Sequence, residues 1–259
     1  MTATRRERLW GLVAVEAAGR GRRVSVADVC AVAVSCVRVT GAWVTAVSDR
    51  GPDFVMGVTD LVSEQLAELQ LTLGEGPCHD VLATAAPVLT GDLDDGVTGR
   101  RWPGFAPGAG QLGVAAVFAF PLVMGAIRAG TMGLHRDSPG PLTQAQLGDC
   151  LLLADVATVL LLDGAGRDGD GAAGGAGLDG QAPGLAAHRA EVDQATGMLT
   201  VQLGVTAAEA FARLRAYAYG QDRRLADVAG DIVARRLRLR PDPDSGPDSG
   251  VGPVPEGTA

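Results

Sequence analysis

Residues 188–237 read HRAEVDQATGMLTVQLGVTAAEAFARLRAYAYGQDRRLADVAGDIVARRL, and this stretch decides how the chain is organised. Apolar residues recur there at helical spacing in three successive runs, which Gly204 and Gly220 separate. Thr206 followed by Glu209 has the spacing of a capping box and predicts the start of the second run. Short turns between three such stripes are typical of a small helical bundle. We therefore expect an all-α module of three helices over residues 182–240.

A segment with almost nothing to bury precedes this module. Residues 163–181 (DGAGRDGDGAAGGAGLDGQ) consist mainly of Gly, Ala and Asp, which is typical of a flexible linker. Residues 241–259 are rich in Pro, Gly and acidic residues, and we expect a disordered acidic tail. Because a Gly-rich linker does not transmit a rigid movement, a signal from residues 1–162 would reach the module through dimerisation or through release of a docked module.

Residues 1–162 are expected to form an α+β domain, an antiparallel sheet flanked by helices. Helical patterns cover 4–19, 25–37 and 60–73, and alternating or strongly apolar stretches predict strands at 42–48, 54–59, 87–93, 114–122 and 127–136. Residues 94–112, with several Gly and Pro, are interpreted as a loop.

A final helix in this domain is predicted from Thr143 to about Leu162, and it is apolar on two opposite sides. A helix of this kind must be buried on both sides. The sheet can cover one side. A homodimer contact is the simplest cover for the other side, and the N-terminal helix of the same chain is the alternative.

The chain has a formal net charge of −8, but the module differs in sign. Residues 187–240 hold nine Arg against six acidic residues, a net charge of +3. A basic segment in an acidic chain indicates a polyanionic partner. A solvated helix face explains the same surplus, and Arg235 and Arg236 also suit the C-terminus of a helix.

Catalytic and metal chemistry have little support in the sequence. The four Cys (Cys30, Cys36, Cys78 and Cys150) form no C-x-x-C pair and have no zinc-like spacing. His79 directly follows Cys78, and neighbours on a helix point about 100° apart, so this pair does not predict a Cys–His dyad. We expect no enzyme, no metal and no cofactor. The N-terminus lacks a signal peptide pattern, so we expect a cytoplasmic protein without a membrane span.

Motifs in both parts carry a family resemblance. DQATGMLTVQLGVTAAEAFARLRAYA (193–218) and LADVAGDIVARRL (225–237) resemble the ANTAR domain, a three-helix RNA-binding module of bacterial transcription antiterminators. LGEGPCHDV (73–81), RWPGFAPGA (101–109), VFAFPL (117–122) and GLHRDSPGPLTQAQL (133–147) resemble a GAF domain, the sensor half found fused to ANTAR in actinobacteria. The family often has a basic residue where Thr196 stands, so one phosphate contact is missing there.

The resemblance implies a sensor that controls an RNA-binding module, which binds hairpins in nascent transcripts so that a terminator fails to form. The candidate RNA-binding residues are Gln194, Thr196, Arg213, Arg215, Arg223, Arg224, Arg235 and Arg236. The candidate walls of a small-molecule pocket in the sensor are Trp43, Cys78, Trp102, Phe105 and Phe118, and the aromatic residues among them are core residues in the alternative interpretation. Cys78 is also a candidate redox-responsive thiol. A second hypothesis is a ligand-binding homodimer that acts through protein contacts at Met198 and Val201, without RNA.

Overall fold

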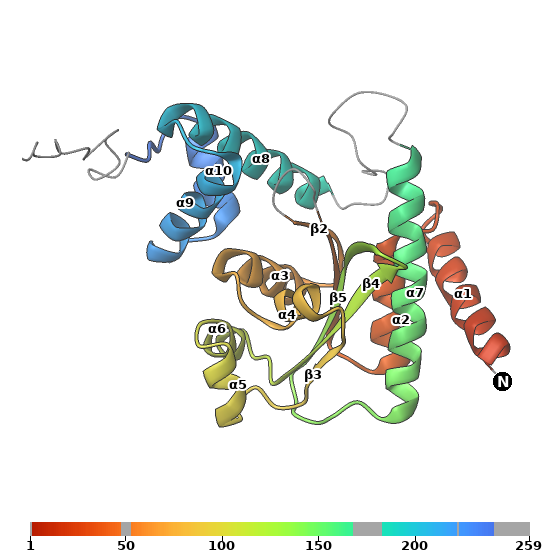
Figure 1. Cartoon of the computed structure of the whole chain (residues 1–259). Helices are drawn as coiled ribbons and strands as arrows, with labels where there is room; N and C mark the ends of the chain where they lie inside the picture. The colour runs from red at the N-terminus through yellow and green to blue at the C-terminus, as the bar shows by residue number, and fades with distance from the viewer. Residues whose placement is uncertain (1, 48–52, 168–182, 222, 241–259) are drawn as a thin grey trace, which may run out of the picture.

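The computed structural model describes residues 2–47, 53–167, 183–221 and 223–240 (Figure 1). The elements are α1 (Thr2–Gly19), α2 (Val26–Val37), β1 (Gly41–Ala46), β2 (Phe54–Val58), α3 (Leu61–Leu73), α4 (Pro77–Thr84), β3 (Val88–Thr90), α5 (Gly96–Arg101), α6 (Phe105–Gln111), β4 (Ala116–Met124), β5 (Ile127–Arg136), α7 (Gln144–Arg167), α8 (Pro183–Leu203), α9 (Ala207–Gly220) and α10 (Leu225–Val233). The first twelve elements make an α+β domain and the last three a helical module. The predicted fold class is confirmed.

The sheet has five strands in the order β2-β1-β5-β4-β3, and every neighbouring pair is antiparallel. Strand β5 occupies the centre, where Trp43 of β1 lies opposite Gly133 and Phe118 of β4 lies opposite Leu134. Because side chains alternate between the two faces of a strand, each strand contributes to two separate cores.

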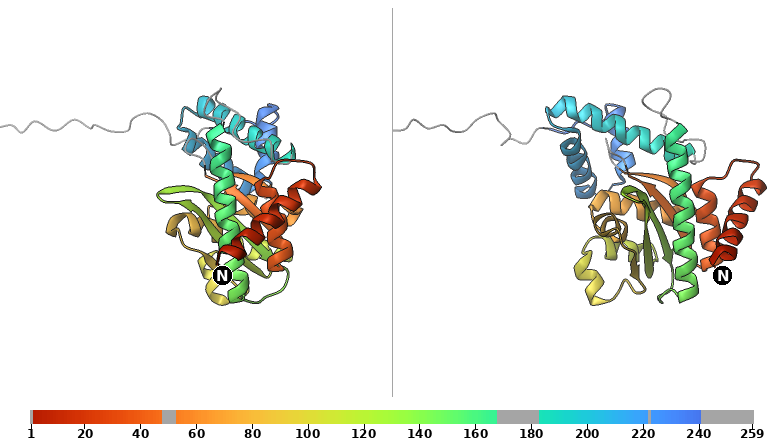
Figure 2. Two further views of the ribbon diagram at one scale, coloured as in Figure 1. Left: turned by 90° about the vertical axis from the view of Figure 1, so that its right-hand side faces the viewer. Right: turned by 45° about the vertical axis from the view of Figure 1, so that its right-hand side comes forward.

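Helices cover both faces of this sheet (Figures 1 and 2). Phe118 and Phe120 point into the core that α2 and α7 cover, with α1 packed outside them. Val117 and Ala119 point to the opposite face and join Trp43 in the core beneath α3, α4 and α6. This alternation places Trp43, Thr45 and Thr131 on the face of the sheet that lines a crevice with the C-terminal module.

Helix α7 explains the apolar pattern that suggested a dimer. Over Gln144–Gly164 it is long and apolar enough to cross a membrane by length and composition, with a mean hydropathy of 1.7. In the structure it packs on β4, β5, α2 and α1 instead. Ion pairs tie α1 to it, from Arg5 to Asp149 at 2.7 Å and from Arg6 to Asp155 at 2.8 Å. The second side of α7 is thus largely covered within the chain, which favours the alternative to a homodimer, although Leu151 remains 44% exposed.

The prediction of a loop over 94–112 is wrong, because two short helices lie there. Asp95 caps α5 and accepts hydrogen bonds from the N–H groups of Val97 and Thr98 at 2.8 and 2.6 Å. The cap of α6 comes from elsewhere in the chain: one carboxylate oxygen of Glu75 accepts from the N–H groups of Gly104 and Phe105, both at 2.7 Å. A cap from a residue 29 positions away is not visible in a local pattern.

The C-terminal module has the three helices that the stripes predict. Leu199, Leu214 and Ile232, one from each helix, are at most 1% exposed and meet in a core of their own. The Thr206 hydroxyl accepts a hydrogen bond from the N–H of Glu209 at 3.2 Å, as expected for the N-cap of α9. Helix α7 continues to Arg167, further than predicted. Most of the predicted linker (168–182) and the predicted tail (241–259) lie outside the described residues.

The close approach of Gly133 to Trp43 gives a test of the sheet register. A Cβ at Gly133 would lie 2.2 Å from the Cε2 and Cζ2 atoms of Trp43. Gly133→Ala is therefore expected to lower the free energy of unfolding by about 1–3 kcal/mol through overpacking, measured by chemical denaturation. Gly99→Ala is the matched control, since no atom lies within 4 Å of its added Cβ. Equal unfolding energies for both variants would contradict this register.

Candidate nucleic-acid interface

One group of arginines gathers at the end of α10. Arg223 and Arg236 both bind the carboxylate of Asp231, at 2.6 and 2.8 Å, and these hydrogen bonds hold the pKa of Asp231 below its usual value. Arg235 adjoins Arg236 in the chain, is exposed, and has a left-handed backbone with φ of 59°. Arg223, Arg235 and Arg236 are called the α10 arginine cluster below; two of them share the carboxylate of Asp231. The cluster therefore keeps a surplus of positive charge for an anionic partner.

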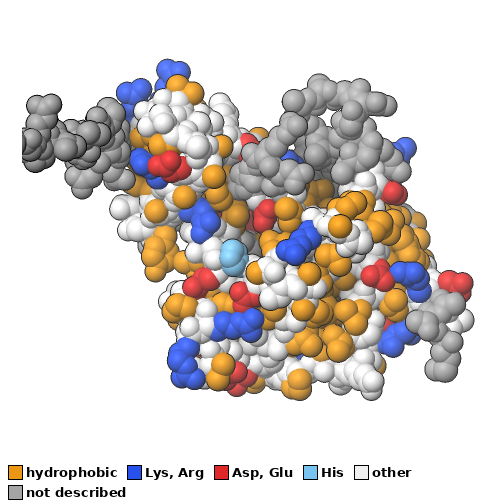
Figure 3. All heavy atoms as spheres, viewed as in Figure 1, with side chains coloured by type: hydrophobic (Ala, Val, Ile, Leu, Met, Phe, Trp, Pro, Cys, Tyr) orange, Lys and Arg blue, Asp and Glu red, His pale blue; other side chains and the backbone are white. Residues whose placement is uncertain are grey.

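In the space-filling view, basic side chains lie both at the outer edge of the module and lower on it, nearer the α+β domain (Figure 3). Arg213 of α9 is not part of the α10 arginine cluster; it pairs with Glu209, one turn earlier in the same helix, at 2.9 Å. Such a pair within one helix contributes little stability. Of the eight candidate RNA-binding residues, the structure brings Arg223, Arg235 and Arg236 together.

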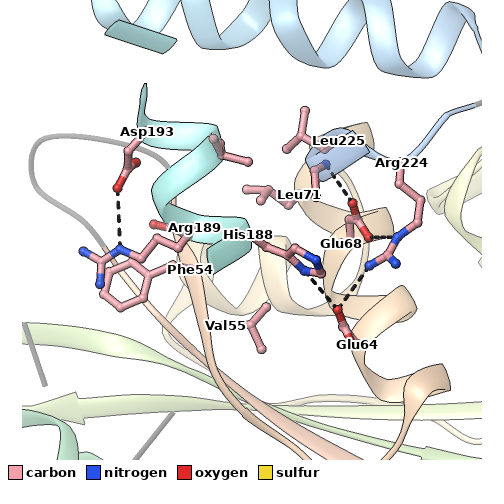
Figure 4. A pocket seen from close by; sticks show the side chains of 13 residues that line it. Phe54, Val55, Glu64, Glu68, Leu71, His188, Arg189, Asp193, Arg224 and Leu225 are labelled. Carbon is pink, nitrogen blue, oxygen red and sulfur yellow. Dashed lines mark hydrogen bonds and ion pairs between the residues drawn. The ribbon is translucent and has the colours of Figure 1, made fainter. Parts of the chain in front are cut away.

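Arg224 points the other way, toward α3 of the α+β domain (Figure 4). Its Nε donates to Glu68 at 2.7 Å, and its terminal nitrogen donates to Glu64 at 3.1 Å. The second oxygen of Glu68 accepts from the backbone N–H of Ala226, in the first turn of α10, at 3.2 Å. His188 of α8 completes the group, with its Nδ1 3.3 Å from Glu64. Two carboxylates of one helix thus bind a cation, an imidazole and a helix N-terminus of the module.

Arg215 also faces the α+β domain. Its Nε donates to the backbone carbonyl of Thr72 at 3.0 Å, and burial lowers the pKa of its guanidinium. The group lies against Gly74, where an added Cβ would be 2.2 Å from one of its nitrogens. Arg213 and Arg215 therefore diverge, as their spacing of two residues along the helix predicts.

A third contact joins the two parts at β2. The guanidinium of Arg189 stacks on the ring of Phe54 at 3.4 Å from its centroid, and its Nε lies 3.6 Å from Asp193 (Figure 4). Sequence reasoning missed Glu64, Glu68, His188 and Arg189 as members of a site. The one available signal was the pair of acids on α3, which are four residues apart and so lie on one face of the helix.

The two polar candidates on α8 differ in accessibility. Gln194 is exposed and can contact a partner. Thr196 is only 5% exposed, and its hydroxyl donates to the carbonyl of Val192 at 2.7 Å. A hydroxyl bonded to its own helix offers less to a ligand, and Thr196 lines the crevice between the two parts, so the structure does not bring it together with the α10 arginine cluster. On the surface named in the second hypothesis, Val201 is 87% exposed, whereas Met198 packs partly against the module core.

The candidate ligand pocket is only partly formed by the residues named for it. A crevice of about 790 Å³ opens between the sheet, α3, α4 and the module. Trp43 and Cys78 line it, together with Thr131, Gln70, Phe211 and Arg215. Phe118 does not, because it lies in the core on the opposite face of the sheet, where Arg136 stacks on its ring at 5.5 Å. The crevice has walls from both domains, which the sequence did not indicate.

Trp102 and Phe105 do not line the crevice either. They form an edge-to-face pair with centroids 5.9 Å apart and are at most 1% exposed. The indole N–H of Trp102 donates to Asp80 at 2.9 Å, which satisfies its polar atom inside the core. Both residues therefore follow the alternative interpretation as core residues.

Cys78 is a poor candidate for a reactive thiol. It is 7% exposed, and burial raises the pKa of its thiol to about 11, although Thr131, Gln70 and Trp43 oppose the shift. A reactive thiol needs an accessible thiolate, and at neutral pH a pKa this high leaves almost none. Within the described ranges, no group of three or more His, Cys, Asp or Glu residues could hold a metal ion.

Comparisons with known proteins bear on the two parts separately. Residues 184–233 match the family model of the ANTAR domain. No curated protein matches the sequence. Similar solved structures include the GAF domain from a phosphoenolpyruvate-protein phosphotransferase (ptsP) of Coxiella burnetii, at 14% identity and a TM-score of 0.48, with 62% of this chain and 97% of that chain covered.

Two further GAF structures are similar. The GAF domain of an Acinetobacter phosphoenolpyruvate-protein phosphotransferase has 12% identity and a TM-score of 0.46, covering 64% of this chain and 96% of its own. The second GAF domain of DevS from Mycobacterium smegmatis has 19% identity and a TM-score of 0.40, covering 55% and 94%. Sequence identities and TM-scores of this size do not indicate a shared ligand or activity. The chain thus carries an ANTAR domain at residues 184–233, behind an α+β domain whose fold resembles that of GAF domains.

Proposed function

We propose that this protein is an RNA-binding regulator of transcription antitermination, in which the GAF-like domain controls the ANTAR domain. The observation that carries the proposal is the ANTAR match over residues 184–233, on a module in which Arg223 and Arg236 share Asp231 next to the exposed Arg235. Arginine suits this role because its planar guanidinium binds phosphate oxygens in a bidentate manner.

The target in this proposal is a hairpin in a nascent transcript. Sequence-specific recognition of RNA usually reads unpaired bases in loops, while cationic side chains bind the phosphates. The α10 arginine cluster supplies phosphate contacts, and the exposed amide of Gln194 supplies a polar contact to a loop base. A hairpin held in this way prevents the competing terminator from forming, and transcription continues.

The input in this proposal is a small molecule that binds in the crevice beside Trp43 and Cys78. The protein acts in the cytoplasm, where its target is made. A homodimer would present two ANTAR domains to two hairpins and raise the effective affinity. Exposed apolar side chains remain on α1 and α7 for such a contact: Val15 is 70% and Leu151 is 44% exposed. No catalytic step is part of the proposal.

A second candidate function is a ligand-binding homodimer that acts through protein contacts without RNA. The observation in its favour is the 87% exposure of Val201 on α8, an apolar side chain at the surface of the module. The two functions differ in whether the full chain binds RNA, so a single assay separates them.

RNA binding is expected to depend on the α10 arginine cluster. In the full chain, Arg223→Gln, Arg235→Gln and Arg236→Gln should each weaken binding of a tandem-hairpin RNA. Each should also reduce the slope of log affinity against log salt concentration by about 1, because each removes a phosphate contact. Fluorescence anisotropy over a range of salt concentrations measures both quantities.

The matched controls for this assay are Arg22→Gln and Arg100→Gln, which remove the same charge from exposed positions on the sensor-like domain. They should leave the salt slope unchanged. If the control and cluster variants weaken binding equally, the cluster is not the RNA-binding surface. An equal loss for every RNA tested would place sequence recognition elsewhere on the module.

Thiol labelling is expected to distinguish a buried Cys78 from a redox sensor. At pH 8, well below its pKa of about 11, Cys78 should react with iodoacetamide far more slowly than Cys36, which is partly exposed. Mass spectrometry of the labelled peptides measures the two rates, and denatured protein supplies the control in which both react fully. Faster labelling of Cys78 than of Cys36 would restore the redox interpretation.

A further inference from the structure

We infer that the sensor-like domain holds the ANTAR domain in an RNA-excluding state, because Glu64 and Glu68 of α3 occupy a site on the module that otherwise binds an RNA phosphate. The site consists of Arg224, His188 and the first turn of α10. The inference rests on the proposed RNA-binding function and adds its mode of control. RNA and α3 are competitors for one cationic face.

The geometry at Glu68 is that of an anion held by a guanidinium and a helix N-terminus. One oxygen accepts from the Nε of Arg224 at 2.7 Å, and the other accepts from the N–H of Ala226 at 3.2 Å. A phosphate group offers the same features, negative oxygens that can bridge an arginine and a backbone N–H. Glu64 adds a second carboxylate, which bridges Arg224 and His188 at 3.1 and 3.3 Å. The face therefore accommodates two negative groups at once.

Within the described residues, the side chains of both carboxylates bind the module. Glu64 and Glu68 are 20% and 15% exposed, and their hydrogen bonds go to Arg224 and Ala226. The two acids on one face of α3 repel one another, and docking removes part of their hydration. Their pairing with the module offsets this cost in the docked state.

The docked contact combines one apolar side chain with polar and ionic contacts. Leu71 of α3 packs against the core of the module beside Leu225, and Arg215 and Arg189 add the contacts to Thr72 and Phe54. The ion pairs of Arg224 are partly exposed, so salt screens them in part. Contacts between domains of this kind are generally reversible.

The same helix connects the docked face to the crevice. Ala67, Gln70 and Leu71 of α3 line the crevice, one turn from Glu64 and Glu68. The Gln70 side chain also accepts a hydrogen bond from the N–H of Cys78 at 2.7 Å. A molecule in the crevice therefore touches α3 and the module together, and it shifts docking by its difference in affinity for the docked and released states.

The test compares RNA affinity of the full chain with that of the variant Glu64→Gln/Glu68→Gln, using a fluorescent tandem-hairpin RNA at fixed low salt. Removing the competing carboxylates raises the fraction of released module, so the variant should bind about three- to tenfold more tightly. The control variant Asp94→Asn/Asp137→Asn removes the same charge at exposed positions of the sensor-like domain. It should change affinity by much less.

Two further measurements test whether Arg224 and the first turn of α10 bind an RNA phosphate. In the Glu64→Gln/Glu68→Gln background, Arg224→Gln should weaken RNA binding and lower the salt slope by about 1, whereas Arg22→Gln should not. Hydrogen exchange at the amides of the first turn of α10 should be faster in the Glu64→Gln/Glu68→Gln chain than in the wild type. Added RNA should slow it again in that variant.

The outcomes separate the inference from the proposed function. If the wild type and both double variants bind RNA equally, Glu64 and Glu68 do not compete with RNA, and the inference is overturned while the proposed RNA binding is retained. If Arg224→Gln has no effect in the released background, the face does not bind phosphate and the inference is likewise overturned. If no variant binds RNA, released or docked, the proposed function fails and the inference fails with it.

Discussion

Helix α3 is the element on which the arrangement of the whole molecule depends, because it is buried from two sides by different domains. Leu66 and Ala67 pack into the core beneath the sheet. On the outer side, Glu64 and Glu68 bind the ANTAR domain. One face of α3 packs into a hydrophobic core, and the other carries the acidic side chains that bind the ANTAR domain. A movement of α3 would therefore change contacts in both domains.

In the inferred mode of control, the distribution of charge is what makes this contact reversible. The residues 187–240 carry a net charge of +3 in a chain with −8 overall, so the module is attracted to the acidic remainder of its own chain. An RNA backbone has a higher density of negative charge than two carboxylates, and it also gains from counterion release. Partly exposed ion pairs of modest strength can yield to such a competitor, whereas a contact dominated by apolar burial would hold the module permanently.

Much of the fold followed from local patterns, and the failures share one cause. The strand 127–136 and the capping box at Thr206 were predictable because their signals lie within a few residues. Helix α6 was missed because Glu75 caps it from a distant position, whereas α5 has a local cap in Asp95 but is only 6 residues long. In the candidate site, Arg224 and Arg215 were identified, but not their partners on α3, which lie more than 140 positions earlier. Contacts between residues so far apart in the sequence produce no periodic pattern in it.

The arginines of the module divide into two groups according to what the fold places opposite them. Arg223 and Arg236 face outward and share Asp231, which steadies the cluster without cancelling its charge. Arg224 faces inward, although it is the next residue after Arg223, because it is the N-cap of α10 and the chain turns there. In the inferred mode of control, Arg223 binds an anionic partner as part of the α10 arginine cluster, whereas Arg224 is held by α3 in the docked state. Net charge alone cannot express this difference, since it depends on the direction of two neighbouring side chains.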